Sequence, residues 1–471
     1  MFDMILRKGL IIDPINHAHF VGDVAVENGK IAAIGEELSG ATRQEFDATG
    51  KIIAPGLVDT HTHLRNDLGH PHSQRMVALA GVTTALDMMG PLDNILDTIE
   101  GSGCGITIAS IEAIDPGVTV SCMRPSVQEQ KDLIAKRLEC GSIGLKIIGG
   151  HVPLDLDICA SFIEESEKQG AWIAWHAGNS VHGSNIEGMK DAVEAANGHF
   201  LHLAHINSYC RGKIRNEAVE ALEAIEMLKA NPNIFCESYV SPRNGTSFNF
   251  KENGELYSKI TKTCLANMGY EPTKAGLRQA LIDGKCSVLS DNGTVGELIS
   301  GPEAAVYWEG RKDSKGSFPM VNPAGSRLLV ATAKRDDGSF VVDCLSTDGG
   351  GIPRNVTIEV GLSMVKFGAM TLDEFVLKAS ANGARALGLP NKGHIGIGAD
   401  ADIVLIDYVQ QKAVMTIANG KVVMREGKLL GKGMTVVCDE QGTDYLAKRN
   451  VPFVVKQSIA DSHISKRLVI K

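Results

Sequence analysis

The chain has 471 residues and a formal net charge of −9, which results from 47 Lys or Arg and 56 Asp or Glu residues. That charge argues against a nucleic-acid partner, because a nucleic-acid-binding protein needs a basic face to neutralise phosphates. Hydrophobic residues make up 44% and charged residues 22% of the chain, so a large core is possible and general disorder is excluded.

The first 55 residues contain short apolar runs separated by turns. Strands are expected over residues 4–12, 22–26, 30–34 and 51–54. An Asn-Gly pair at 28–29 lies between the second and third runs, and this pair favours the tight turn of a β-hairpin. The segment 1–55 is too short to form its own core, so we expect it to pair with another part of the chain.

From residue 56 to residue 388, short apolar runs alternate with amphipathic helical stretches. This alternation predicts βα units around a parallel sheet, and seven such units fit a (β/α)₈ TIM barrel that still needs its last strand. The seven expected strands are 57–64, 83–89, 106–114, 143–148, 172–175, 200–206 and 233–239. The clearest helices between them are 126–139, 157–169 and 216–229.

Two segments compete for the eighth strand. Residues 287–290 precede Asp291, and residues 341–346 precede Asp348. We favour the second, because helical stretches follow it closely at 358–367 and 371–387, as they should after the last barrel strand. The segment of about 246–340 then becomes a long insertion, which we expect to cover the mouth of the barrel.

After residue 389 strands return, at 401–406, 414–418 and 421–424. This pattern of short strands and turns matches that of residues 1–55. We therefore expect both chain ends to build one small β-sandwich domain, with 389–471 as its C-terminal part. The segment after 439 is a tail that the pattern does not place.

The strongest local signal for chemistry is Asp59-Thr60-His61-Thr62-His63, at the end of the first barrel strand. Residues two apart on a strand face the same side, so His61 and His63 can point together into the barrel mouth, where barrel enzymes keep their sites. Imidazole is a common ligand of zinc, iron and nickel. His17 and His19 have the same spacing in the N-terminal β segment, but no barrel strand ends there and we do not expect them to bind metal.

Four more polar residues lie at the C-terminal ends of later barrel strands: Lys146, His176, His205 and Asp348. Lys146 interrupts an apolar strand, where burial lowers the pKa of an amine and makes it reactive toward carbon dioxide. The alternative is an ion-paired lysine. Asp348 is a carboxylate suited to metal binding and to proton transfer, and Asp291 is its competitor if residues 287–290 form the eighth strand.

These residues, in this order, resemble the amidohydrolase superfamily over nearly the whole chain. The flanking segments Ile53-Ala54-Pro55-Gly56-Leu57-Val58-Asp59 and Asn382-Gly383-Ala384-Arg385-Ala386 also fit that resemblance. Within the superfamily, the chain looks like the binuclear branch that holds dihydroorotases, hydantoinases and acyl-amino-acid deacylases.

The resemblance implies two divalent metal ions, expected to be zinc, and a carboxylated Lys146 that bridges them. One ion would be held by His61, His63, Lys146 and Asp348, and the other by Lys146, His176 and His205. Two cations lower the pKa of a bridging water and polarise the substrate carbonyl. The implied reaction is hydrolysis of an amide or cyclic-amide C–N bond, with Asp348 as the catalytic residue that moves the proton from the water to the leaving nitrogen.

Candidate substrate contacts follow the metal ligands along the chain. Arg65 completes H-x-H-x-R, a pattern whose arginine binds a substrate carboxylate in dihydroorotases; a salt bridge at the rim is the alternative. Further candidates are Asn207, Tyr209 and Arg211 after the sixth strand, for which loop packing is the alternative, and Glu237 at the end of the seventh strand.

The segment after Asp348 departs from the dihydroorotase pattern. It reads Gly349-Gly350-Gly351, where a dihydroorotase would be expected to continue with a His-Ala-Pro-like stretch. We therefore expect an N-acyl amino acid, a hydantoin or a related cyclic ureide as substrate. The glycines would leave room for a bulky part of it or for approach by backbone amides.

Two other functions remain open at this stage. A mononuclear heterocycle deaminase would be expected to carry a glutamate soon after the fifth-strand histidine, but His176 is followed by Ala177-Gly178-Asn179-Ser180. A non-catalytic hydantoinase-like scaffold would be expected to have lost metal ligands, whereas all six candidates are present here.

The sequence also predicts a compartment and partners. No apolar run approaches the roughly 20 residues of a membrane span, and the N-terminal residues lack the layout of a signal peptide. The ten cysteines contain no C-x-x-C pair, which favours a reducing compartment. We expect a cytoplasmic homo-oligomer that acts on a small-molecule substrate and has no membrane partner.

Overall fold

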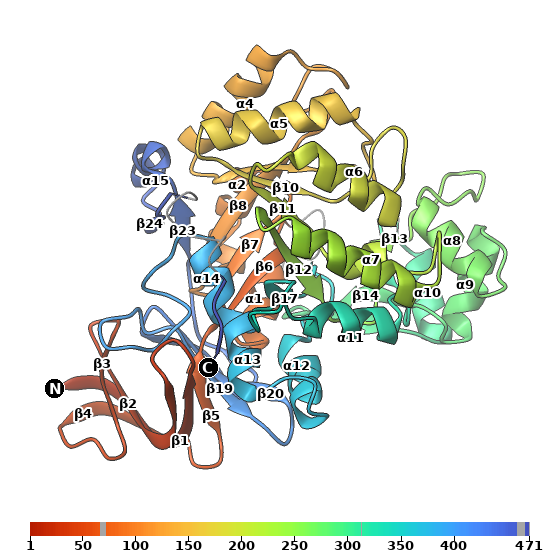
Figure 1. Ribbon diagram of the computed structural model, residues 1–471. Helices are drawn as coiled ribbons and strands as arrows, with labels where there is room; N and C mark the ends of the chain where they lie inside the picture. The colour runs from red at the N-terminus through yellow and green to blue at the C-terminus, as the bar shows by residue number, and fades with distance from the viewer. Residues whose placement is uncertain (66–71, 312, 459–466, 471) are drawn as a thin grey trace.

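A curled parallel sheet forms the centre of the protein (Figure 1). The computed structural model describes residues 1–65, 72–311, 313–458 and 467–470. Each strand of this sheet pairs with the next along the chain in the parallel sense. The strands are β6 (Leu57–His63), β7 (Val82–Asp87), β8 (Thr107–Ala113), β9 (Gly144–Ile147), β10 (Trp172–Trp175), β11 (Leu201–Leu203), β12 (Ile234–Tyr239) and β17 (Cys344–Ser346).

The sheet closes through a short segment that follows β17. Strand β18 (Gly349–Gly350) pairs in parallel with Thr62 and His63 of β6, so the last strand region returns to the first. This confirms the TIM barrel and the choice of residues 341–346 for its eighth strand. The strands are continuous apolar runs because both faces of a parallel barrel sheet are covered.

Helices cover the outside of the barrel. The longer ones begin at polar caps: Ser126 and Asn216 accept hydrogen bonds from backbone N–H groups of α4 and α7, as is usual for N-cap residues. The helices that follow barrel strands are α1 (Ser73–Leu79), α2 (Leu92–Leu96), α3 (Ile99–Ser102), α4 (Val127–Glu139), α5 (Leu156–Lys168), α6 (Ile186–Ala196), α7 (Glu217–Ala230), α11 (Ala324–Thr332), α12 (Thr357–Lys366), α13 (Leu372–Val376), the π-helix η2 (Leu377–Ala381) and α14 (Asn382–Ala386).

Both chain ends form one nine-stranded sheet, which confirms the expected β-sandwich domain. The link between the ends is the antiparallel pairing of β5 with β19, and Figure 1 shows these strands side by side at the foot of the barrel. Asn28 and Gly29 have positive φ angles of 52° and 77°, as a tight hairpin turn requires. The strands are β1 (Phe2–Asp13), β2 (Ala18–Glu27), β3 (Lys30–Gly35), β4 (Thr42–Asp47), β5 (Ile52–Pro55), β19 (Ile403–Asp407), β20 (Lys412–Ala418), β21 (Lys421–Arg425) and β22 (Lys428–Leu429).

The insertion between β12 and β17 is a small unit with its own sheet and core. Its strands lie in the order β13-β16-β14-β15, and its core contains the fully buried side chains of Phe248, Trp308 and Phe318. Residues 287–290 therefore belong to this sheet and not to the barrel. The elements are β13 (Thr246–Ser247), α8 (Lys259–Asn267), α9 (Lys274–Ile282), β14 (Ser287–Asp291), β15 (Gly296–Ile299), α10 (Pro302–Glu309) and β16 (Lys315–Ser317).

The end of the chain departs from the expected layout. Strand β23 (Thr435–Cys438) pairs in parallel with β8 of the barrel, and β24 (Phe453–Val455) pairs with β23. These residues thus leave the sandwich and extend the barrel sheet, with η3 (Glu440–Gly442) and α15 (Thr443–Lys448) between them. The reason is apolar burial: Val436, Val437 and Cys438 are fully buried. Over the described ranges, no helix is long and apolar enough to cross a membrane.

Candidate metal centre

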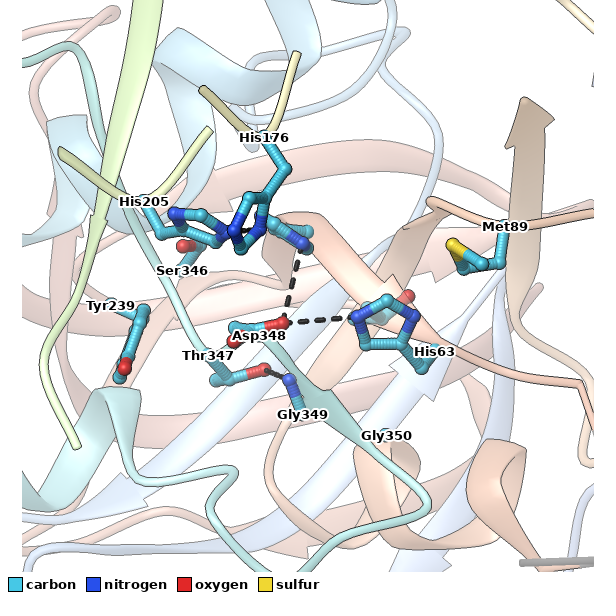
Figure 2. A network of polar contacts seen from close by, with 12 residues as sticks. His63, Met89, His176, His205, Tyr239, Ser346, Thr347, Asp348, Gly349 and Gly350 are labelled. Atoms are coloured by element: carbon cyan, nitrogen blue, oxygen red, sulfur yellow. Dashed lines mark hydrogen bonds and ion pairs between the residues drawn. The ribbon is translucent and has the colours of Figure 1, made fainter. Parts of the chain in front are cut away.

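Three of the predicted ligands meet where β6 and the segment after β17 lie side by side. The Nε2 atom of His63 lies 3.0 Å from Oδ1 of Asp348, and Nε2 of His61 lies 3.3 Å from the same oxygen. Figure 2 shows His63 and the carboxylate of Asp348 pointing toward each other. One ligand atom from each of the three residues lies within 4.8 Å of the others. The strand alternation that placed both histidines on one face accounts for this geometry.

Lys146 joins this group from β9. Its Nζ atom lies 3.3 Å from Nε2 of His61, and only 3% of the residue is exposed. Burial lowers the pKa of this amine to about 8, although the carboxylates of Asp348 and Glu237 act in the opposite direction. A larger share of the amine is therefore neutral at physiological pH than for an exposed lysine.

His176 and His205 form the other side of the group. Nδ1 of His176 and Nε2 of His205 face each other at 2.8 Å, and the rings of His205 and His61 stack with centroids 5.1 Å apart. The loop after β9 allows this approach: a Cβ at Gly150 would lie 2.3 Å from Nε2 of His176. His202 points elsewhere and accepts a hydrogen bond from the indole of Trp172.

Burial makes these imidazoles poor bases. It lowers the pKa of His61 to about 4, with the charge of Lys146 acting in the same direction. Burial also lowers the pKa of His176 and of His205 well below the ordinary value. A neighbouring histidine lowers each of these two pKa values further. Neutral imidazoles keep a lone pair available, which is the form that binds a metal ion.

Asp348 is held in its ionised form. Burial alone would raise its pKa, but Arg354 and His61 outweigh burial, and the pKa lies well below the ordinary value. The guanidinium of Arg354 lies 2.9 Å from Oδ2 of Asp348. The backbone of Asp348 has a positive φ of 47°, a conformation that bulky residues rarely adopt. Oδ1 is thereby directed at the histidines while Oδ2 is paired with arginine.

Asp59 fixes the segment that carries Asp348. Its Oδ2 accepts a hydrogen bond of 2.6 Å from the hydroxyl of Thr347, and its Oδ1 accepts one from the N–H of His61. Burial raises the pKa of Asp59 to about 7, although these hydrogen bonds favour the ionised form. One carboxyl group thus holds the first and last barrel strands together directly beneath the ligands.

Glu237 does not lie where a substrate contact was expected. It is fully buried behind His61, whose Nδ1 atom lies 2.6 Å from its Oε1. The same oxygen accepts the N–H of His205 at 2.7 Å, and Oε2 accepts the hydroxyl of Ser346. Both oxygens are therefore engaged within the protein. Glu237 orients the imidazole of His61, a supporting contact typical of metal-binding histidines.

Two further candidates for substrate binding are also buried behind the site. Asn207 is fully buried, and its Oδ1 accepts hydrogen bonds from Ser238 and from the N–H of Tyr239. Tyr209 is fully buried, and its hydroxyl accepts the N–H of Ala177, next to His176. The loop after β11 folds back into a 3₁₀ turn, η1 (Ile206–Tyr209), which buries both residues, and neither belongs to the cavity lining among the described residues.

The two arginine candidates occupy different places. Arg211 lines the cavity above the predicted ligands. Arg65 does not belong to that lining among the described residues; it is half-buried, and its charge helps to lower the pKa of Glu112, which burial raises. Arg65 therefore lies outside the described lining of the cavity and acts on the charge of Glu112.

A cavity of about 250 Å³ opens above the predicted metal ligands. His63, Lys146, His176, His205 and Asp348 line its floor. Its walls combine apolar and polar side chains, namely Met89, Ile148, His151, Ser208, Arg211, Tyr239, Asn244, Gly245, Thr246, Ser247, Ile260, Lys315, Ile352 and Arg354. Arg354 and Lys315 had no sequence signal, because each reaches the site from a segment outside the barrel strands.

The glycines after Asp348 serve protein packing and not the substrate. A Cβ at Gly349 would lie 2.2 Å from Oδ1 of Asn355, and one at Gly350 would lie 2.4 Å from the carbonyl oxygen of His63. Their N–H groups donate to Thr347 and Asn355, and Figure 2 shows the first of these contacts. The prediction that these glycines leave room for substrate, or let backbone amides approach it, is therefore wrong for both.

The donor set fits divalent metal ions. Four imidazoles, an ionised carboxylate and a buried amine converge at the floor of one cavity, and the facing ring nitrogens of His176 and His205 cannot both carry protons. Nδ1 of His176 and Nε2 of His205 face each other, and Nε2 of His63 faces Oδ1 of Asp348. A bound cation would take up the lone pairs of such a group of ligand atoms.

Comparisons with known proteins agree with this geometry. A model of the amidohydrolase family matches residues 52–430. The chain is 25% identical over 425 residues to an allantoinase of Enterococcus faecalis, and the match covers 86% of each chain.

Among solved structures, the fold resembles an N-acyl-D-glutamate deacylase of Bordetella bronchiseptica, complexed with zinc and a phosphonate inhibitor, at 16% identity. The TM-score is 0.64, with 92% of this chain and 99% of that chain covered. It also resembles a dihydropyrimidinase of Brevibacillus agri, at 16% identity and a TM-score of 0.61, over 97% and 99% of the two chains. These two likenesses concern the fold.

Proposed function

The chain belongs to the amidohydrolase family and is a hydrolase of carbon–nitrogen bonds other than ordinary peptide bonds, and on that premise we propose that it opens an amide or cyclic-amide bond in a small, carboxylate-bearing molecule. The observation that carries the proposal is the convergence of His63, Lys146, His176, His205 and Asp348 on the floor of one cavity, with His61 buried against Lys146 and Asp348.

Two divalent metal ions complete this site in the proposal, and zinc is the expected metal. His61, His63 and Asp348 would hold one ion, His176 and His205 the other, and a carboxylated Lys146 would contribute to both. When bound, such ions polarise a carbonyl and lower the pKa of water toward neutrality. The low pKa of His61, His176 and His205 supports this assignment, because these three ligands are ready to bind without first losing a proton.

Carboxylation of Lys146 is the chemical change that the proposal needs. The Nζ atom must be neutral to attack carbon dioxide, and a pKa of about 8 raises the neutral fraction at pH 7–8. The carbamate that results is an anion with two oxygen donors, which are the ligands that hard divalent ions accept. It would also replace the buried amine beside His61 by an anion.

Asp348 moves the proton. It is ionised, so Oδ1 can accept the proton released when water attacks the carbonyl and then deliver it to the leaving nitrogen. Arg354 keeps Oδ2 occupied at 2.9 Å, which leaves Oδ1 as the oxygen that faces the reacting groups. The walls of the cavity reduce access of bulk water, which strengthens these interactions.

The cavity supports a substrate of limited size. A volume of about 250 Å³ suits a small molecule better than a polypeptide chain. N-acyl amino acids carry the proposed carboxylate within that size, whereas hydantoins, dihydropyrimidines and allantoin are ring compounds of similar size in which a carboxylate forms only on ring opening. The last of these is a cyclic ureide, and the allantoinase match adds it to the candidates.

A turnover screen of the metal-loaded protein tests the proposal. The panel contains N-acyl-D- and N-acyl-L-amino acids, hydantoins, dihydropyrimidines, allantoin and aminated heterocycles. We expect hydrolysis of at least one amide or cyclic amide, with activity lost on chelation and restored by zinc. Ammonia release from an aminated heterocycle alone would replace the proposal with the deaminase alternative.

A further inference from the structure

Two positive charges in the cavity have no carboxylate partner. Within the described residues, the only carboxylate that lines the cavity belongs to Asp348, and Arg354 already pairs with it. Arg211 and Lys315 line the same cavity, Arg211 from the loop after β11 and Lys315 from β16 of the insertion.

Among the described residues, the hydrogen bonds of Arg211 go to neutral groups only. Its Nε donates to Oδ1 of Asn322 at 2.8 Å, and one of its terminal nitrogens donates to the hydroxyls of Tyr239, at 2.6 Å, and Ser208, at 3.3 Å. Asn322 is in turn anchored by the carbonyl oxygens of Ser241 and Arg243. These contacts fix the position of the guanidinium and leave its charge unneutralised, so the group is ready for an anion.

The register of β16 directs Lys315 into the cavity. The next residue, Gly316, lies against the core of the insertion, where a Cβ would come within 2.1 Å of the ring of Phe248. Side chains alternate along a strand, so Lys315 points to the opposite face. Lys315 pairs in the sheet with Ser247 of β13, which also lines the cavity. In the described part of the chain, no hydrogen bond or ion pair engages the Lys315 ammonium.

We propose that Arg211 and Lys315 form an anion subsite for a carboxylate of the substrate, and that Lys315 is its specificity-determining residue. This inference rests on the proposed function and makes the insertion part of the binding site. Two cations in a partly enclosed cavity carry a net attraction for anions, and a carboxylate bound there receives charge-assisted hydrogen bonds from both sides. A neutral substrate of the same shape would leave both charges unpaired.

The test uses two probes that the enzyme cannot hydrolyse. N-methanesulfonyl-DL-methionine carries a carboxylate, and N-methanesulfonyl-DL-methioninol carries a hydroxymethyl group in its place; a sulfonamide replaces the cleavable amide in both. Calorimetric titration of the metal-loaded full chain gives the Kd of each probe. The variants are Lys315→Met, Lys315→Arg and, as a matched control, Lys285→Met, which removes a lysine charge from an exposed position of the insertion outside the cavity lining.

We expect wild type to bind the acid more tightly than the alcohol. Lys315→Met should weaken binding of the acid by about tenfold or more, the usual scale for a hydrogen bond to a charged group, and change the Kd of the alcohol by less than about twofold. Lys315→Arg should retain much of the preference, and Lys285→Met should leave both probes unchanged. Equal binding of the two probes by wild type, or an unchanged preference in Lys315→Met, overturns the inference. Both results are read from binding, so they are distinct from a failure of amide hydrolysis in the turnover screen.

Discussion

Lys146 is the residue on which the two-metal arrangement depends. Lys146→Ala should bind less than half of the metal of wild type and lose hydrolysis, because it removes the only group expected to reach both ions. Added acetate or propionate should partly restore both, since a short carboxylate fits the vacated space. Metal content and turnover of the variant, each measured with and without the added carboxylic acid, check this prediction. Full activity of the variant without added acid would rule out a bridging role.

Asp348 and Asp291 provide a matched pair for the proton-transfer role. Asp348→Asn should reduce turnover by roughly 10²–10⁴, the scale of general acid–base catalysis, while circular dichroism shows a folded chain. Asp291→Asn should have a small effect, because Asp291 lies in the insertion sheet and pairs with His72 at 3.5 Å. The opposite ranking would contradict the assignment of Asp348.

For single residues, the sequence predicted the candidate metal ligands and missed the buried side chains that orient them. The ligands His61 and His63 follow from a two-residue spacing on one strand, which is a local property. Glu237 is 176 residues from the histidine that it orients, and Thr347 is 288 residues from Asp59. A single sequence contains no signal for such distant contacts, and for this reason Glu237 was assigned to the substrate.

A buried lysine in the π-helix η2 predicts how the stability of the protein depends on pH. Lys378 lies in η2, is fully buried, donates to the carbonyl oxygen of Val342, and has a pKa lowered by burial from 10.5 to about 8. Between these two pH values the unfolded chain binds more protons than the folded chain, so the contribution of Lys378 to the free energy of unfolding rises with pH.

The Lys378→Met variant lacks this titration. Wild type should therefore gain about 1–2 kcal/mol of stability relative to the variant between pH 7.5 and 9.5. Urea unfolding of both proteins at the two pH values measures the difference. A stability gap that stays constant, or that moves the other way, would show that Lys378 keeps an ordinary pKa in the folded chain.

Destabilising the insertion should weaken substrate binding and leave the metal content unchanged. Trp308 is fully buried in its core and donates to the carbonyl oxygen of Phe248. Trp308→Ala should cost about 3–5 kcal/mol of local stability and raise KM, because β13 and β16 form one wall of the cavity. Metal content should stay at the wild-type level, and Trp308→Phe should behave more like wild type. Loss of metal in Trp308→Ala would place the insertion closer to the ligands than the structure does.

The elements themselves were predicted well where their periodicity is local. Each of the seven apolar runs assigned to the barrel is a strand, and capped helices such as α4 begin within a residue of the expected position. The pairing of β23 with β8 was not predictable, because a short apolar run such as Thr435–Cys438 fits any open edge of a sheet. The same limitation kept β14 in competition with β17 until the pairing of β17 with β12 was known.

The whole molecule joins three units around one cavity. The barrel supplies the predicted ligands, the insertion supplies one wall with Lys315, and the nine-stranded sheet from both chain ends supports the barrel from outside. In this arrangement the chemistry is carried by the barrel and the choice of substrate by the loops and the insertion. The candidate metal ligands could therefore be predicted from the residues at the strand ends. The shape of the cavity could not, because it depends on segments that only the folded chain brings together.

The most direct test of the account is a titration of metal-free protein with zinc in which bound metal and amide hydrolysis are measured on the same sample. The account predicts that hydrolysis appears as metal binds and that about two ions bind per chain at saturation, with the six predicted ligands required for both. Hydrolysis that persists at wild-type rate without bound metal, or the absence of any saturable metal binding, would contradict it.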